Sequence, residues 1–252
     1  MAGKIKIDTI QGESQLKFNI GETTYITIGG ASWNVALPMN VQSTFLTTGD
    51  ATIGGNLTVS GTTTTVNTVN LIVADKNIEI ANSAAPTDAL ADGAGITVKG
   101  DSDKTLTWAT ATKSFTFNQG LDIQRVIETV TANATAINAN TTIDVLSGSI
   151  SNYTANVAAN WTLNVRANST TRLDAVMGTN DSMTIAYLAT QLGANTFYQS
   201  AMQIDGASVT PKFQGGTAPS AGNATSIDLY AFTIIKTAAN TYTVLGSQTQ
   251  YA

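Results

Sequence analysis

The sequence of 252 residues contains no cysteine and no histidine. The first absence excludes disulfide bonds, thiol chemistry and cysteine metal sites. The second removes the commonest general base and the commonest transition-metal ligand. Because enzymes rely heavily on such groups, we expect a protein that is not an enzyme and that has no catalytic residues, no cofactor and no metal site.

Charged side chains are also scarce, at 12% of the chain, which is about half the share in an average soluble domain. The net charge is −5, and no run of lysine or arginine supplies the counterion release that drives nucleic-acid binding. No stretch approaches the roughly 20 apolar residues of a membrane span, and Met1–Ile7 lacks the apolar region of a signal peptide. We therefore expect a chain made in the cytoplasm, with no nucleic-acid partner and no membrane insertion.

Threonine is abundant and makes up about one residue in six. Its β-branched, hydroxyl-bearing side chain fits a half-exposed pleated strand better than a helix. Apolar and polar residues alternate with a period of two in many places, as at Ile5 and Ile7 or at Trp161, Leu163 and Val165. This alternation is typical of strands with one buried and one solvated face. The sequence predicts an all-β protein.

Turn signals and composition divide the chain into three parts. We expect an N-terminal β segment in residues 1–49, a middle β-rich part in 50–121 and a C-terminal domain in 122–252; the family resemblance given below implies that the first serves for attachment and the second as a shaft. Short β runs flank a Gly-Gly-Asn turn within residues 51–61. Such units cannot bury both faces alone, so they stack as a solenoid or wrap around identical chains.

Strands are expected at several further places. They are predicted at Leu71–Ala74, around Ile78 and Ile80, at Ile96 and Val98, at Leu106 and Trp108, at Phe115 and Phe117, and then repeatedly from Ile143 to Val244. Turn signals every 8 to 15 residues favour a β-sandwich or a jelly-roll-like C-terminal domain. Residues 122–138 also fit a helical spacing, so a short coiled-coil neck is an alternative there, although the many β-branched residues favour a strand.

Few residues suggest a site. Asp101 with Asp103, and Asp88 with Asp92, resemble the start of a calcium loop but lack the remaining ligands, so solvated turns are preferred. Hydrolysis of a glycan requires two carboxylates about 5 to 9 Å apart across a cleft, and the scattered acidic residues give no specific sign of one. Recognition of a host glycan by exposed aromatic rings is more plausible, and the candidates are Tyr198, Phe197 and Tyr153, each of which could instead pack in the core or between chains.

Two groups of segments carry a resemblance to known proteins. The runs GNLTVSGTTT at Gly55–Thr64 and LIVADKNIEI at Leu71–Ile80 resemble a module of structural and tail-fibre proteins from marine and cyanobacterial tailed bacteriophages. The opening Lys4–Ile10 resembles the starts of these proteins. A stronger similarity, to their C-terminal domain, involves Asn160–Arg166, Ile204–Gly206, Val209–Pro219, Phe232–Thr237 and Gly246–Gln250.

The resemblance implies a structural protein of the virion, assembled in the host cytoplasm. It suggests a homotrimeric tail-fibre or tail-appendage subunit that attaches to other virion tail or capsid proteins and touches a host surface glycan with its C-terminal domain. A β-rich, cysteine-free trimer would also hide the edge strands that a threonine-rich chain exposes. The alternatives are a capsid decoration or baseplate protein without receptor contact, and a bacterial adhesin or surface-layer fragment, which the missing signal peptide disfavours.

Overall fold

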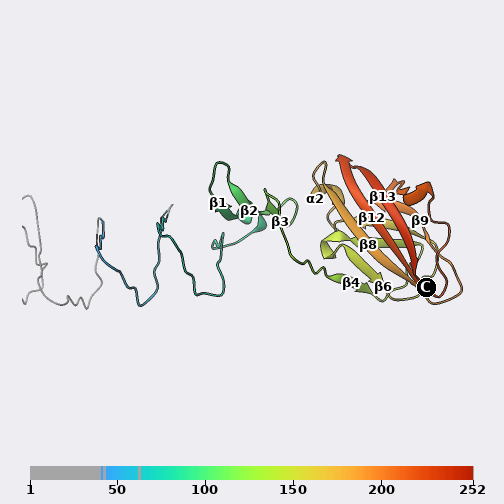
Figure 1. The fold of residues 1–252 in the computed structure, drawn as a ribbon, viewed down its shortest axis with the longest axis horizontal. Helices are drawn as coiled ribbons and strands as arrows, with labels where there is room; N and C mark the ends of the chain where they lie inside the picture. Colours follow the sequence, from blue (N-terminus) through green and yellow to red (C-terminus); the bar gives the residue numbers. More distant parts are fainter. Residues whose placement is uncertain (1–40, 42–43, 62–63, 252) are drawn as a thin grey trace, which may run out of the picture. The chain divides into compact units, whose positions relative to one another are not determined.

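A computed structural model describes residues 41, 44–61 and 64–251, and Figure 1 shows their arrangement in strands and loops. The chain is all-β, as the sequence predicted: its helices are single turns, whereas the longest strands span 10 to 13 residues. The strands expected near Ile5, Leu16 and Ile26 lie outside the described residues. The chain divides into two units, Met1–Ile72 and Val73–Ala252. The expected bounds at 49 and 121 stay a prediction.

Residues 44–61 and 64–80 contain no strand. The strands expected in 51–61, at Leu71–Ala74 and around Ile78 are therefore not formed in the single chain. Their apolar side chains are exposed, with Leu57 at 68% and Ile72 at 88%. A strand requires a partner for its hydrogen-bond ladder and a surface for its apolar face, and this part of the chain provides neither by itself.

The next element is a three-stranded antiparallel sheet with the strand order β1-β2-β3. Its strands are β1 (Gly95–Val98), β2 (Lys104–Ala109) and β3 (Ser114–Phe117), preceded by the single-turn helix α1 (Asp88–Ala91). The turn between β2 and β3 confirms the predicted hairpin. Thr87 caps α1 by accepting a hydrogen bond from the backbone N–H of Leu90 at 3.3 Å.

The segment 122–138 forms no helix in the structure. Residues 121–129 are irregular and exposed, and only Val130–Asn133 forms a strand, β4. The preference for a strand over a coiled-coil neck is thus confirmed for four residues and is wrong for the residues before them. The strand begins where a pairing partner, Ile150–Tyr153, first becomes available.

Residues 130–251 form a domain with two sheets, which we call the C-terminal domain (Figure 1). One sheet has four strands in the order β10-β9-β7-β5, and the other has six in the order β11-β13-β12-β8-β6-β4. The strands after β4 are β5 (Asn140–Asp144), β6 (Ile150–Tyr153), β7 (Trp161–Arg166), β8 (Ser182–Gln191), β9 (Gln199–Ile204), β10 (Ala207–Val209), β11 (Lys212–Phe213), β12 (Ser226–Ala238) and β13 (Thr241–Tyr251). Single turns of helix are η1 (Val145–Ser147), α2 (Leu173–Val176) and η2 (Gln214–Gly216).

The first six strands of this domain alternate between the two sheets. β4, β6 and β8 pair in parallel in one sheet, and β5, β7 and β9 pair in parallel in the other. Each pass of the chain therefore adds one strand to each sheet, as in a short solenoid. A jelly roll is built from antiparallel strands, and only the long hairpin β12–β13, its partner β8 and the pair β9–β10 follow that pattern here.

The two sheets of the C-terminal domain share one core. Trp161 on β7, Tyr187 on β8 and Tyr230 on β12 are fully buried in it. The rings of Tyr187 and Tyr230 stack with their centroids 5.0 Å apart, and Trp161 meets Tyr230 edge-on at 5.5 Å. Such aromatic pairs add about 0.5 to 1.5 kcal/mol beyond the burial of their surface.

Candidate functional site

Tyr153, one of the three predicted glycan contacts, lies in this core. Only 5% of its surface is exposed, and its hydroxyl donates a hydrogen bond to the carbonyl oxygen of Thr142 at 3.3 Å. Burial raises the pKa of the phenol. The alternation of strand β6 turns this ring inward, so no face of it is free to stack on a sugar.

Phe197 and Tyr198, the other two candidates, are half-buried beside the start of β9. The ring of Phe197 packs against the core. The backbone N–H of Tyr198 donates to Asn160 Oδ1 at 3.0 Å, which fixes the main chain there. Phe197 and Tyr198 adjoin each other in sequence, but neither lines any of the described hollows of the surface. The structure thus brings the three predicted residues into no common site.

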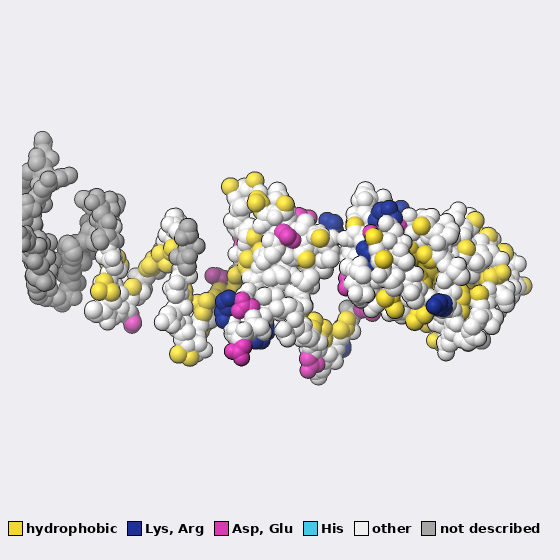
Figure 2. Space-filling model, turned by 90° about the horizontal axis from the view of Figure 1, so that it is seen from above, with side chains coloured by type: hydrophobic (Ala, Val, Ile, Leu, Met, Phe, Trp, Pro, Cys, Tyr) yellow, Lys and Arg dark blue, Asp and Glu magenta, His cyan; other side chains and the backbone are white. Residues whose placement is uncertain are grey.

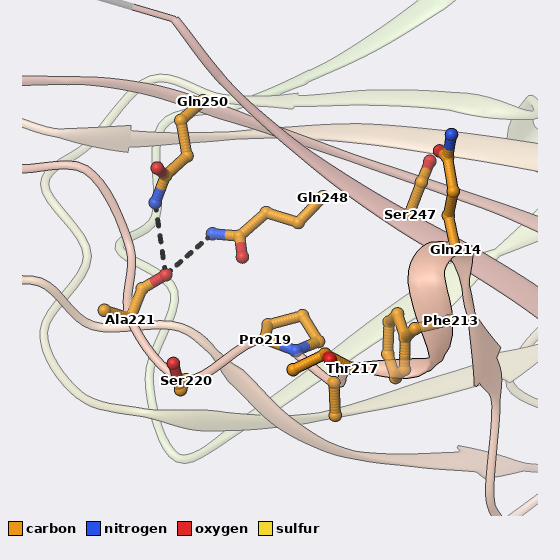
Figure 3. A pocket seen from close by; sticks show the side chains of 10 residues that line it. Phe213, Gln214, Thr217, Pro219, Ser220, Ala221, Ser247, Gln248 and Gln250 are labelled. Carbon is orange, nitrogen blue, oxygen red and sulfur yellow. Dashed lines mark hydrogen bonds between the residues drawn. The ribbon is translucent and has the colours of Figure 1, made fainter.

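A groove of about 560 Å³ lies elsewhere, between strand β13 and the loop that follows η2 (Figure 3). Its size falls within the usual range for small-molecule sites. Phe213 and Pro219 supply two rings, and the other lining residues are small or carry hydroxyl or amide groups. These are Gln214, Thr217, Ala218, Ser220, Ala221, Ser247, Gln248 and Gln250.

Two glutamines tie the loop to the strand. Gln248 and Gln250 both donate from Nε2 to the carbonyl oxygen of Ala221, at 3.0 and 3.3 Å (Figure 3). They alternate with outward residues along β13 and so point to the same side of the sheet. Gly215 and Gly216, at φ values of 75° and 79°, allow the chain to turn into this loop, because side chains rarely adopt that backbone conformation.

The groove carries no charged side chain among its lining residues. Hydroxyls and amides can both donate and accept hydrogen bonds, and ring faces can pack on apolar patches of a ligand. This chemistry suits a neutral ligand rich in hydroxyl groups better than a phosphate or a cation. No pattern in the sequence indicated that two glutamines of a distant strand would face this loop.

A buried carboxyl group lies near one end of the same hairpin. Asp228 is fully buried, and its Oδ2 accepts hydrogen bonds from Gln191 Nε2 at 2.7 Å and from the backbone N–H of Asn223 at 3.1 Å. Its Oδ1 has no hydrogen-bond partner within the described residues. Burial raises the pKa of Asp228, and the bond from Gln191 opposes that rise. The pair holds the ends of β8 and β12 together.

A second buried polar cluster joins α2 to the hairpin. Lys236 Nζ lies 2.9 Å from Asp174 Oδ1 and donates to the carbonyl oxygens of Asp174 and Met177 at 2.6 and 2.9 Å. The backbone N–H of Asn240 donates to Asp174 at 2.7 Å. This bond, and then the one from Lys236, lowers the pKa of Asp174. Every contact here is satisfied within the fold, so the cluster stabilises the hairpin.

The β1–β3 sheet has one apolar and one polar face. On one side its strands carry Ile96, Leu106, Trp108, Phe115 and Phe117, which lie opposite one another in the register. On the other side the cross-strand neighbours include the threonine pairs Thr97–Thr105 and Thr107–Thr116. Phe115 is 64% exposed and Ile96 57% exposed. No described part of the chain covers this apolar face, which is a feature of surfaces that bind another protein.

The acidic pairs considered for calcium are engaged in local contacts. Asp103 forms an ion pair with Lys99 at 2.7 Å, and Asp92 accepts a hydrogen bond from the backbone N–H of Thr110 at 2.8 Å. Across the described ranges, no three acidic, histidine or cysteine side chains are grouped to hold a metal ion. The same ranges contain no helix that is long and apolar enough to cross a membrane.

Similarity to known proteins adds no assignment to these surfaces. No family model, no curated protein and no solved structure matches the chain.

Proposed function

We propose that this chain is a structural subunit of a bacteriophage particle, a homotrimeric tail-fibre or tail-appendage protein that attaches by its N-terminal part. The proposal starts from the resemblance of Gly55–Thr64, Leu71–Ile80 and the C-terminal segments to such proteins. The all-β architecture is compatible with it. A fibre must be stiff and insensitive to redox conditions, and a cysteine-free β protein meets both demands.

One structural observation carries the proposal of self-association. Residues 44–61 and 64–129, which we call the middle section, expose nearly all of their large apolar side chains. Val69 is 99% exposed, Leu46 80% and Ile127 77%. A soluble chain does not leave so many apolar residues in water without a partner. Identical copies wound around one another would cover them and supply the missing strand partners.

The C-terminal domain differs because it is closed around its own core and presents the polar groove beside Gln248 and Gln250. This division of labour suits a fibre with an assembled stalk and a folded tip. In this proposal the tip contributes to recognition of the host surface, where neutral polysaccharides are a chemically suitable class of ligand for an uncharged groove.

The test is the mass of the purified full-length chain in solution, measured by light scattering. A trimer of the 26.1 kDa chain has a mass of about 78 kDa. We expect that mass, together with a trimer band that persists in SDS without heating. A monomer of 26.1 kDa at all accessible concentrations would contradict the proposal.

The alternative is a capsid decoration or baseplate protein that never contacts the host. The exposed apolar residues of the middle section would then be covered by other virion proteins instead of by copies of this chain. Copy number separates the two possibilities, because a decoration protein is present in hundreds of copies on each particle and a fibre in few. Quantitative mass spectrometry of purified particles measures it.

A further inference from the structure

The six-stranded sheet of the C-terminal domain has two sides, and the one turned away from the core is unusual. We call this side of β8, β12 and β13, continued by β6 and β4, the outer face. In β8 and β12 almost every second residue is buried in the core, and in β13 Val244 and Gly246 are buried. The residues that alternate with these point outward. They are Ser182, Thr184, Ala186, Leu188 and Thr190 on β8; Ile227, Leu229, Ala231, Thr233 and Ile235 on β12; and Thr243, Leu245, Ser247, Thr249 and Tyr251 on β13.

Strand β12 is apolar on both sides. Its inward residues Tyr230, Phe232 and Ile234 are fully buried, yet Leu229 and Ile235, on either side of this run, point outward. A strand with one face in water alternates between apolar and polar residues, whereas a strand covered on both faces is apolar almost throughout. The sequence of β12 thus has the pattern of a strand with a second layer on its outer side.

The outer face carries no charge on the strands β4, β6, β8, β12 and β13. The outward residues of the two short strands are Val130, Ala132, Ile150 and Asn152. Lys212 on the two-residue strand β11 is a charged neighbour at one edge of the sheet, beside Leu245. Surfaces that stay in water usually carry charged residues at roughly one position in four, whereas the cores of protein interfaces are depleted in them. In the view of Figure 2, few charged side chains are visible on the surface of this domain.

A hollow of about 420 Å³ lies at one end of the outer face. It is lined by Leu192, Ile227 and Tyr251, which are 66%, 38% and 56% exposed. An exposed apolar hollow of this kind can receive a side chain from a neighbour. It adds shape to what would otherwise be a flat surface.

The size of the outer face fits a stable contact. The five strands contain 42 residues, and each residue of a sheet covers about 16 Å². The face therefore measures roughly 700 Å² per copy, and two copies in contact would bury about 1,400 Å² together, which lies within the range of specific interfaces.

We propose that the outer face packs against the C-terminal domain of a second copy of this chain. The molecule has a net charge of −5, so most of its surface repels an identical molecule, and an uncharged face is the part that can meet another copy without that cost. This proposal rests on the self-association in the proposed function. It adds an interface on the C-terminal domain, although that domain already has a core of its own. Assembly then involves the C-terminal domain as well as the middle section.

The absence of cysteine from the chain allows a clean test. In Thr249→Cys the sole thiol lies on the outer face, where position 249 is exposed in the single chain and pairs with Leu229. Ser169→Cys places the sole thiol in an exposed loop after β7 and is the matched control. The rate of reaction with N-ethylmaleimide is measured for both full-length variants, and their mass is measured in the same samples.

We expect the thiol of Thr249→Cys to react at least tenfold more slowly than that of Ser169→Cys in the assembled protein. Adding Leu229→Glu to Thr249→Cys brings a charge into the contact and should restore the rapid reaction, while near-ultraviolet circular dichroism verifies the fold. Thr233→Lys, also on the outer face, replaces Leu229→Glu if that variant does not fold.

Three other outcomes overturn the inference and remain distinguishable. Equally rapid reaction of both thiols in an assembled protein would show that assembly occurs through other surfaces, which leaves the proposed function intact. A slow reaction in a monomer would show that the chain covers the face itself. A rapid reaction in a monomer would also overturn the self-association on which the inference rests.

Discussion

Trp108 and Trp161 illustrate how differently two regions of this chain treat the same residue. Trp161 lies in the C-terminal domain, is fully buried and contacts two tyrosine rings. Trp108 lies in the middle section and packs edge-on against Phe115, itself 64% exposed. Both residues sit on strands with alternating apolar side chains. What separates them is a second sheet, which the C-terminal domain forms from its own chain and the middle section does not.

The source of that second sheet is the path of the chain. In the C-terminal domain the strands cross between two sheets, so each new strand covers the inner face of the opposite sheet. The β1–β3 sheet instead consists of neighbouring strands in one layer, and nothing in the described residues lies on its apolar side. The C-terminal domain therefore has a core of its own, whereas the middle section leaves its apolar residues exposed and, in our proposal, depends on partners.

The largest effect is expected from disrupting those partners. Replacing Phe115 and Phe117 together by serine removes two rings from the apolar face of the β1–β3 sheet. We predict that the mass measured by light scattering falls about threefold, or that the dissociation constant of the assembly rises at least tenfold. The free energy of unfolding of the C-terminal domain should change by less than about 0.5 kcal/mol. Thr105→Ser with Thr116→Ser, on the opposite face, is the control and should keep the full mass. An unchanged mass in the variant with serine at positions 115 and 117 would contradict the dependence of the middle section on partners.

Within the C-terminal domain, Trp161→Ala should be the most destabilising single substitution. Loss of a buried tryptophan leaves a cavity and typically costs about 3 to 5 kcal/mol. Chemical denaturation followed by near-ultraviolet circular dichroism measures the free energy of unfolding. Trp108→Ala, measured in the same way, should leave the unfolding of the C-terminal domain within about 0.5 kcal/mol of the parent. Equal losses in the two variants would show that the regions are not independent.

Removal of Lys236 should have a smaller but clear effect. Lys236→Met keeps roughly the length of the side chain, but removes the ammonium group from Asp174 and from two carbonyl oxygens, while Asp174 retains the bond from Asn240. Because Asp174 remains partly exposed, we expect a loss of about 2 to 3 kcal/mol, below the full cost of breaking a buried ion pair. Lys99→Met, which removes an exposed pair with Asp103, is the control and should cost less than about 1 kcal/mol. Identical small losses would exclude a stabilising role for the buried cluster.

The smallest of the expected effects is the change in the pH dependence of stability when Asp228 is replaced. Because the pKa of Asp228 is raised, the folded domain binds its proton more tightly than the unfolded chain does. The free energy of unfolding therefore falls as the pH rises from the unfolded pKa through the folded one. We predict that Asp228→Asn, which removes the charge but keeps an oxygen that can accept from Gln191 and Asn223, gains stability relative to the parent as the pH rises from acid to neutral. Urea denaturation at several pH values measures the difference. A gain that does not grow with pH would contradict the assignment.

Asp174 should act in the opposite sense. Its lowered pKa means that the contribution of the carboxylate is present above the pKa of the unfolded chain and disappears as the pH falls through the folded value. Asp174→Asn should therefore lose most stability at neutral pH and approach the parent in strong acid. Together, the two substitutions measure how much Asp228 and Asp174 each contribute to the change in the free energy of unfolding at acid pH.

The sequence predicted the strands that find partners in the same chain. The alternation in Trp161–Arg166, in Ser182–Gln191 and in the final hairpin was sufficient, because one face of each strand is buried. The predictions failed in 51–61, where short β runs flank a turn, and at the continuous apolar run Leu71–Ala74, because no partner strand exists in the described chain. Periodicity shows that a segment can form a strand, not which molecule completes the sheet.

The parallel pairing and the groove could not be predicted in the same way. Parallel and antiparallel neighbours produce the same alternation, and only the path of the chain between strands distinguishes β6 from a hairpin partner. The groove brings Phe213 close to Gln248 and Gln250. In the sequence, strand β12 and the first part of β13 lie between Phe213 and these glutamines. Tyr153 was a candidate for an exposed ring, but the register of β6 with β8 turns it inward.

Hydrogen exchange measured by mass spectrometry tests the central claim most directly, because it reports on both regions at once. In the assembled full-length protein we predict slow exchange for the amides of β1–β3 and of the C-terminal domain alike. In the variant with serine at positions 115 and 117, exchange in β1–β3 should become rapid while the C-terminal domain stays slow. Rapid exchange of β1–β3 in the assembly, or slow exchange in a monomer, would contradict the dependence of the middle section on identical partners.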